Sequence, residues 1–144
     1  MSRSFFKVEP CADAVGGGFR PPDGVVLCHN HLPRAVDVTQ AMAHELIHAY
    51  DHCRAADLDW ATLDHHACSE VRAASLSGDC SFANEVMRGH AGVRGQHQAC
   101  ARRRAALSVA MNPACVGGPR EAEAAVDRVF DACFADTAPF DRIP

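Results

Sequence analysis

The sequence predicts an α+β domain that is mainly helical, contains a small β element and is supported by disulfide bonds. Three observations indicate this class: helical patterns account for most of the chain after residue 33, one short run is β-branched, and eight cysteines are spread along the chain. A length of 144 residues fits one domain. We therefore expect residues 1–144 to form a single unit, with residues 1–15 as a poorly defined N-terminal segment.

The clearest β signal lies before the first helical stretch. The run from Val25 to Cys28 is apolar and β-branched, which predicts a strand. Gly16-Gly17-Gly18 and Pro21-Pro22-Asp23-Gly24 precede this run and favour turns. We therefore expect a short strand that follows a turn-rich entry into the domain.

A long helix is predicted from about Pro33 to Ala56, because no Pro or Gly interrupts residues 36–57. Inside it lies His44-Glu45-Leu46-Ile47-His48, an HExxH motif. Two histidines four residues apart project from one face of a helix and can bind one metal ion. Glu45 is then placed to take a proton from a metal-bound water, whose pKa zinc lowers to about 7. The motif predicts a zincin-like domain that holds Zn²⁺ and hydrolyses peptides; a chance pair of exposed histidines is the alternative.

Four further helices are predicted after the motif helix. Their expected ranges are Ala61 to Ser77, Ser81 to Arg88, Gln96 to Asn112, and a last helix from Pro119. Gly78 and Pro119 support these boundaries, because glycine favours the residue after a helix and proline favours its first turn. Apolar stripes mark the faces expected to build the core: Ala67, Val71 and Ala74 on the first of these helices, and Val126, Val129, Phe130, Cys133 and Phe134 on the last. We expect Trp60, in the connection before them, to anchor the same core.

The motif supplies two metal ligands, whereas a catalytic zinc usually has three protein ligands and one open position. Glu70 is the third ligand that we favour, because it lies on the next helix, which must fold back against the first. His66 lies one turn earlier on the same face and is the alternative ligand. An ordinary salt bridge from Glu70 to Arg72 or Arg54 would leave it no metal role.

Other polar residues are expected to support the site without binding the metal. Asp51 shares a face with His48 but lies too far along the helix for its short side chain, so it should orient His48 or a neighbour. If His66 is not a ligand, it can donate a hydrogen bond to a developing oxyanion. His29 and His31 fall in a loop, where we expect exposed side chains rather than ligands.

The cysteines predict a disulfide framework. No CxxC pair occurs, which argues against a zinc ribbon, an iron–sulfur site or a thioredoxin-type centre. An even number with wide spacing favours disulfides made in an oxidising compartment over buried free thiols. The connectivity is not determined by the sequence, since eight cysteines allow 105 pairings.

Charge and hydropathy exclude other classes. The net charge of −4 gives no general attraction to nucleic acid, and no apolar run approaches the roughly 20 residues that span a bilayer. Residues 1–10 show neither a secretory signal nor a mitochondrial presequence. Arg102-Arg103-Arg104 spreads around a helix, so we expect a solvated face with one structural ion pair; docking to an anionic membrane surface is the weaker alternative.

Several stretches resemble one family when they are taken together. They are His44 to Arg54, Ala67 to Cys80, Gly24 to Cys28, Arg102 to Ala105, and the ending Cys133 to Asp136 with Pro139 to Ile143. The HExxH motif alone does not identify one family. These segments in this order are specific, and they cover nearly the whole chain from Gly16 onward. They resemble the mitochondrial inner membrane metalloproteases that also serve as ATP synthase assembly factors.

The resemblance implies a zinc metalloendopeptidase that is peripheral on the intermembrane-space side of the inner membrane. Family members remove the N-terminal propeptide of ATP synthase subunit a (subunit 6) and act as a chaperone when this subunit joins the Fo sector. By the motif match, His44 and His48 would be metal ligands and Glu45 the catalytic residue. The family enters its compartment by oxidative folding of cysteines. Relatives usually carry a longer N-terminal segment, which we expect this chain to lack.

Two other classes of function stay open at this point. The same fold can serve as a non-proteolytic assembly or binding factor, since an intact motif shows that catalysis is possible and not that the protein uses it. A relative in vertebrates has also been described as a Ku-interacting protein, which suggests a nuclear partner, although the sequence shows no broad basic surface. The expected partners are therefore the subunit a precursor, Fo assembly intermediates and the inner membrane surface, without nucleic acid.

Overall fold

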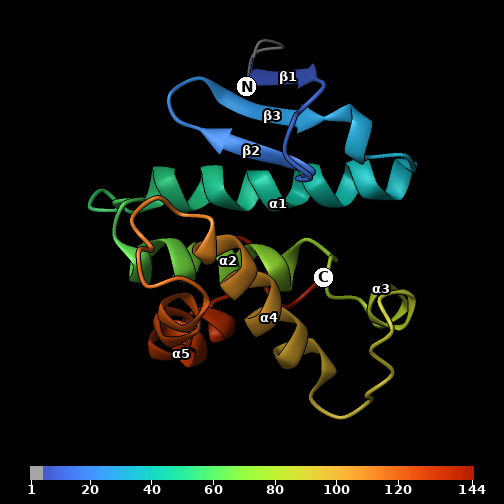
Figure 1. Cartoon of the computed structure of the whole chain (residues 1–144), viewed down its shortest axis with the longest axis vertical. Helices are drawn as coiled ribbons and strands as arrows, with labels where there is room; N and C mark the ends of the chain where they lie inside the picture. Colours follow the sequence, from blue (N-terminus) through green and yellow to red (C-terminus); the bar gives the residue numbers. More distant parts are fainter. Residues whose placement is uncertain (1–4) are drawn as a thin grey trace.

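The computed structural model describes residues 5–144, and within them it confirms the α+β class (Figure 1). The elements are β1 Phe6–Glu9, β2 Gly17–Arg20, β3 Gly24–Cys28, the 3-10 helix η2 His29–His31, α1 Ala35–Arg54, α2 Leu63–Leu76, α3 Phe82–Met87, α4 Gln96–Ala110 and α5 Pro119–Ala135. α1 lies between the small sheet on one side and the remaining helices on the other (Figure 1). Among the described helices, none is long and apolar enough to cross a membrane.

The sheet has the order β1-β3-β2, with β1 parallel and β2 antiparallel to the central β3. All five residues of β3 are buried, and the strand predicted from Val25 to Cys28 is confirmed. β1 was not predicted, because it is only four residues long and mostly exposed, and residues 1–15 as a whole show no strong period. The turn predicted at Gly16-Gly17-Gly18 is wrong, since β2 begins at Gly17. A Cβ on Gly17 would lie 2.5 Å from the carbonyl oxygen of Val26, so this glycine allows close strand pairing.

The motif helix α1 has the predicted extent to within about two residues at each end. It starts after Arg34, whose backbone N–H donates to the Asp37 carboxylate at 3.0 Å. This carboxylate also suits the positive end of the helix. α1 contacts the sheet on one side and α2 on the other, so several of its polar residues are buried. They are Glu45, His48 and Asp51.

The helical core is built around α2, which packs against α1, α4 and α5. The predicted stripe on α2 is confirmed, because Ala67, Val71 and Ala74 are fully buried. Small residues on the facing helices allow close approach: Ala101 and Ala105 on α4, and Ala122 and Ala125 on α5. On α5, Val126, Phe130 and Cys133 are buried, while Val129 and Phe134 pack against the cluster.

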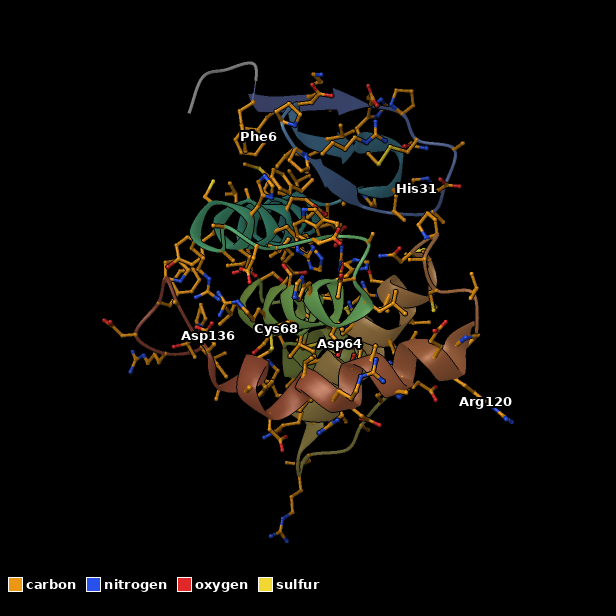
Figure 2. All side chains as sticks on the ribbon, turned by 90° about the vertical axis from the view of Figure 1, so that its left-hand side faces the viewer. Phe6, His31, Asp64, Cys68, Arg120 and Asp136 are labelled. Carbon is orange, nitrogen blue, oxygen red and sulfur yellow. A yellow bond between two sulfur atoms is a disulfide. The ribbon has the colours of Figure 1, made fainter. Side chains whose placement is uncertain are left out.

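Three disulfides confirm the predicted framework and fix its connectivity. The pairs are Cys11–Cys28, Cys68–Cys133 and Cys80–Cys100. The first ties the N-terminal segment to β3. The second joins Cys68 of α2, which is labelled in Figure 2, to Cys133 of α5. The third links the segment after α2 to α4. Cys53 is exposed and Cys115 is buried, and both are free thiols.

The arginine run on α4 differs from the prediction of a single ion pair. Arg102, Arg103 and Arg104 pair with Asp127, Glu85 and Asp79 at 2.6, 2.6 and 2.7 Å, respectively. Successive helix positions point about 100° apart, so each arginine reaches a different neighbouring element. The run therefore joins α4 to its surroundings instead of forming one solvated face.

Candidate metal centre

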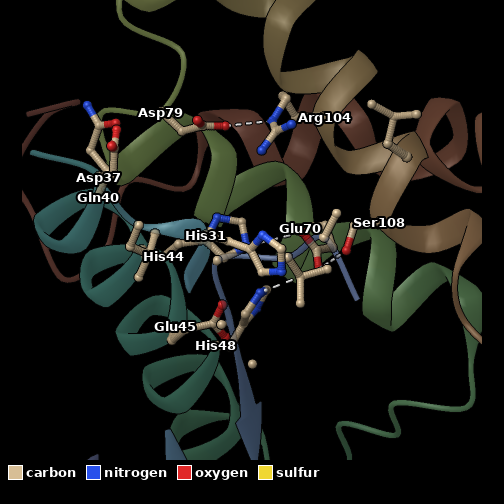
Figure 3. A pocket seen from close by; sticks show the side chains of 18 of the residues that line it. His31, Asp37, Gln40, His44, Glu45, His48, Glu70, Asp79, Arg104 and Ser108 are labelled. Atoms are coloured by element: carbon tan, nitrogen blue, oxygen red, sulfur yellow. Dashed lines mark hydrogen bonds and ion pairs between the residues drawn. The ribbon is translucent and has the colours of Figure 1, made fainter. Parts of the chain in front are cut away.

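α1 and α2 bring the two motif histidines and Glu70 into one group. Potential ligand atoms of His44, His48 and Glu70 all lie within 4.8 Å of one another. One carboxylate oxygen of Glu70, Oε2, is 3.4 Å from His44 Nε2, and the other, Oε1, is 3.4 Å from His48 Nε2. Figure 3 shows the three side chains converging from the two helices. Two imidazoles and one carboxylate are a donor set that suits a catalytic zinc.

Glu45 directly follows His44 on α1 and is buried, with 6% of its surface exposed. It lines the same cavity of about 730 Å³ as the ligand group. The cavity is bounded by residues of β2, η2, α1, α2, α3 and α4 together with loops. A carboxylate at this place can exchange a proton with a water molecule held beside the ligand group.

Glu70 is held by two polar neighbours besides the motif histidines. The Ser108 hydroxyl donates to Glu70 Oε1 at 2.5 Å, and His66 Nε2 lies 3.2 Å from the same oxygen. His66 Nδ1 is 2.9 Å from the side-chain amide nitrogen of Asn112, so Nδ1 accepts and Nε2 carries the proton that Glu70 accepts. His66 therefore contacts the carboxylate and lies outside the group of three potential ligands. Within residues 5–144, the ion pairs of Glu70 are to histidines and not to Arg72 or Arg54.

His48 is oriented by a buried network that reaches it through Ser69. Nδ1 of His48 lies 2.8 Å from Ser69 Oγ, and this hydroxyl donates to Asp51 Oδ2 at 2.9 Å. Because the ionised carboxylate only accepts, Ser69 must accept from the Nδ1–H of His48. The lone pair of His48 Nε2 then faces the ligand group, which is the orientation that a metal requires. Asp51 thus contacts His48 through a hydroxyl that the sequence pattern did not reveal.

The charge of Asp51 is balanced by arginines that also hold the C-terminal segment. Arg72, with 1% of its surface exposed, donates from Nε to Asp51 at 3.0 Å. Its other nitrogens donate to the backbone carbonyls of Asp136 and Ala138. Arg54 bridges Asp51 at 3.2 Å and Asp136 at 2.5 Å. The segment after α5 is therefore part of the support for the site.

The Glu70 carboxylate gives the site a negative charge that a bound cation can neutralise. Burial disfavours a charge on His44, but hydrogen bonding and attraction to the Glu70 carboxylate outweigh it and raise the pKa of His44 to about 9. Burial likewise opposes the charge of Glu70, yet the neighbouring histidines hold its pKa well below the ordinary value. The proton on His44 therefore occupies the place that a divalent cation would take. These residues fit a bound zinc ion.

Trp60 does not anchor the core as the sequence suggested; it is half-buried and borders the cavity. Its ring lies 5.6 Å from the His48 ring and 6.2 Å from the Phe19 ring, measured between centroids. The core is filled instead by residues of α2, α4 and α5, many of them alanines. Trp60 therefore forms an aromatic wall of the cavity beside His48.

The sheet faces the cavity with an unpaired strand edge. β3 is paired on both sides within the described residues, whereas β2 is the edge strand on the cavity side. Gly17, Gly18 and Phe19 of β2 line the cavity. His29 is exposed in η2, and His31 borders the cavity with Nε2 3.3 Å from the carbonyl oxygen of Cys11. Neither histidine belongs to the ligand group.

An HExxH helix, a carboxylate from the following helix and an edge strand beside the cleft together define a domain of the HExxH metallopeptidase class. The model of the Peptidase M76 family matches residues 1–141, and the chain belongs to this family.

Curated relatives of this chain include mitochondrial inner membrane proteases. The chain is 46% identical to "Mitochondrial inner membrane protease ATP23" of Mycosarcoma maydis, covering 94% of this chain and 66% of that protein. It is 49% identical to the "Mitochondrial inner membrane protease ATP23 homolog" of Homo sapiens and 48% identical to that of Danio rerio. Each alignment covers 96% of this chain, and 56% and 54% of the relative, respectively. The chain thus spans about half to two thirds of these relatives. No solved structure shows significant similarity to it.

Proposed function

We propose that this chain is the catalytic domain of a zinc metalloendopeptidase. The observation that carries the proposal is the convergence of His44 Nε2, His48 Nε2 and the Glu70 carboxylate within 4.8 Å, beside a cleft that Glu45 also lines. Three protein ligands with an open cleft are typical of catalytic zinc sites, whereas structural sites are closed by a fourth protein ligand. When bound, zinc supplies a Lewis acid that polarises a carbonyl group and lowers the pKa of water.

The residues around the ligand group have separate roles in this proposal. Glu45 accepts a proton from the attacking water and returns it to the leaving amine nitrogen. Asp51 and Ser69 hold His48 in one tautomer, and His66 with Ser108 holds Glu70. The geometry thus supports an action of His66 on Glu70 rather than on an oxyanion.

The relatives' names and the cysteines support a proposed place of action. The names support an enzyme of the mitochondrial inner membrane. Three disulfides support an oxidising compartment, which at this membrane is the intermembrane space. We propose a peripheral position on that side, with the subunit a precursor of ATP synthase as the substrate and Fo assembly intermediates as further partners.

Cleavage of the precursor by purified protein tests the catalytic proposal. The zinc-loaded chain should cut a peptide that spans the propeptide junction of subunit a, and mass spectrometry should give one main product pair. Glu45→Gln keeps the shape and the ligands but removes the base, so the rate should fall at least about a hundredfold while zinc stays bound. Cleavage at an unchanged rate by the zinc-loaded Glu45→Gln protein would refute the proposed mechanism.

A further inference from the structure

The cleft beside the metal centre has an apolar wall opposite the edge strand. On and just after α4, residues at helical spacing line the cavity: Arg104, Leu107, Ser108 and Met111. A neighbouring face of α4, with Ala101, Ala105 and Val109, is fully buried in the core. α4 therefore turns a second face toward the cleft; Arg104 and Ser108 of this face contact Asp79 and Glu70, whereas Leu107 and Met111 remain exposed.

Large apolar side chains on this wall are exposed to solvent. Leu107 is 57% exposed, Met111 is 64% exposed, and Met87 at the end of α3 is 72% exposed, although all three line the cavity. Exposed apolar side chains that line one cleft indicate a surface for an apolar ligand. Methionine is flexible and polarisable, which allows it to contact side chains of different shapes. A smaller hollow of about 510 Å³ shares Trp60 and Met111 with the cleft and continues the wall.

The charged residues of the cleft are already paired with each other. Arg34 contacts Asp37 at 2.5 Å, and Arg104 contacts Asp79 at 2.7 Å, a pair drawn in Figure 3. Arg88 also pairs with Asp79. Apart from Glu45 and the ligand group, the charged side chains of the described lining therefore have partners of opposite charge. A charged side chain placed here would lose water without gaining a free partner.

We propose that the cleft selects an extended, uncharged peptide segment with apolar side chains at alternate positions. The backbone of this segment pairs with the free edge of β2, as strands add to an exposed sheet edge. Side chains alternate along a strand, so every second one faces Leu107, Met111 and Met87. The inference names the substrate class and so rests on the proposed function, but binding can be measured without catalysis.

The single tryptophan provides the measurement, since Trp60 borders both hollows and is the only one in the chain. Blocked octapeptides without tryptophan are titrated into zinc-loaded Glu45→Gln protein, and Trp60 fluorescence is followed. One peptide alternates leucine and serine, and two others carry aspartate or lysine in place of leucine. The leucine peptide should bind at least about tenfold more tightly than either charged peptide.

Matched variants locate the contact. Leu107→Glu should weaken binding of the leucine peptide at least about fivefold, and Met111→Glu repeats the test if Leu107→Glu unfolds. Val93→Glu makes the same charge change at a residue that is 80% exposed and lines neither hollow, so it should bind as the parent does. Equal binding of the three peptides, or no effect of both wall variants, would overturn the inference.

Catalysis separates this inference from the proposed function. If the wild-type protein cleaves all three peptides with equal kcat/KM, the substrate class is wrong and the peptidase stands. If it cleaves none while the leucine peptide binds selectively, the peptidase proposal fails and the apolar peptide site remains. Both proposals are supported if the wild-type protein has a higher kcat/KM for the leucine peptide and if Leu107→Glu removes this preference by raising KM.

Discussion

Ser69 Oγ lies 2.8 Å from Nδ1 of His48, and both side chains are buried. This contact fixes which nitrogen of His48 carries the proton, because the hydroxyl passes its own hydrogen to Asp51. The candidate ligand His48 is therefore oriented by a side chain from the neighbouring helix, through a hydroxyl rather than directly by a carboxylate. Loss of such a partner typically lowers metal affinity by about 10- to 100-fold.

Replacement of Ser69 by alanine should weaken zinc binding by about 10- to 100-fold, because His48 loses its orienting partner and Asp51 loses a donor. Competition with a chelator measures this affinity without any substrate. Ser69→Thr keeps the hydroxyl and should restore most of the affinity. Zinc affinity that is the same in Ser69→Ala and wild type would show that the contact is only structural.

Removal of Glu70 should have a larger effect on the metal than removal of His66. Glu70→Ala deletes a member of the ligand group, so zinc should be lost during dialysis against a mild chelator. His66→Ala removes one hydrogen bond to Glu70 and should retain zinc with reduced affinity. The reverse order of zinc contents would assign the third ligand to His66.

The metal-free protein should lose stability as the pH rises from about 6.5 to about 9. Burial opposes the proton on His44, but Glu70 more than compensates and raises the folded-state pKa from 6.5 to about 9. A raised pKa stabilises the fold fully below the unfolded pKa, and this contribution is lost as the pH passes the folded pKa. Zinc occupies the same lone pair, so its affinity should rise over this range.

Thermal unfolding between pH 6 and pH 9.5, with zinc and with chelator, measures this dependence. The midpoint of the metal-free protein should fall relative to that of the zinc-loaded protein as the pH rises. His44→Ala should remove most of the slope in the metal-free protein, because the titrating group is gone. A slope that survives in His44→Ala would assign the dependence to another group.

Two thiols should react in the unreduced, denatured protein, namely those of Cys53 and Cys115. Replacing both Cys68 and Cys133 with serine opens the link between α2 and α5, and the free energy of unfolding should fall by about 2–4 kcal/mol. Cys53→Ser should change it little, since this thiol is free and exposed. Eight reactive thiols would contradict both the framework and the proposed compartment.

Proteolysis and assembly should be separable in cells. Glu45→Gln changes proton transfer at one buried carboxylate and leaves the surface of the domain intact. Cells with only this form should accumulate the subunit a precursor and still assemble ATP synthase, as native gel electrophoresis would show. Failure of assembly, with the variant folded and correctly located, would mean that the two proposed roles depend on the same chemistry.

The sequence by itself determined the elements that depend on local pattern. The HExxH helix, the helix ended by Gly78 and the helix begun by Pro119 were predicted to within a few residues, because helix periodicity, caps and breakers act over a single turn. The position of Glu70 on the helix after the motif was also sufficient to select it as a candidate ligand. The helix boundaries need only neighbouring residues, whereas the choice of Glu70 also assumed that its helix folds back against the motif helix.

The tertiary structure decided what depends on distant segments. Ser69 meets Asp51 18 positions away, and Ser108 meets Glu70 across 38 positions, contacts that no local period encodes. The pairing of β2, the location of Trp60 beside the cleft and the choice among disulfide pairings have the same origin. They are set by which surfaces meet when the helices and the sheet pack, and that free energy is shared among many residues at once.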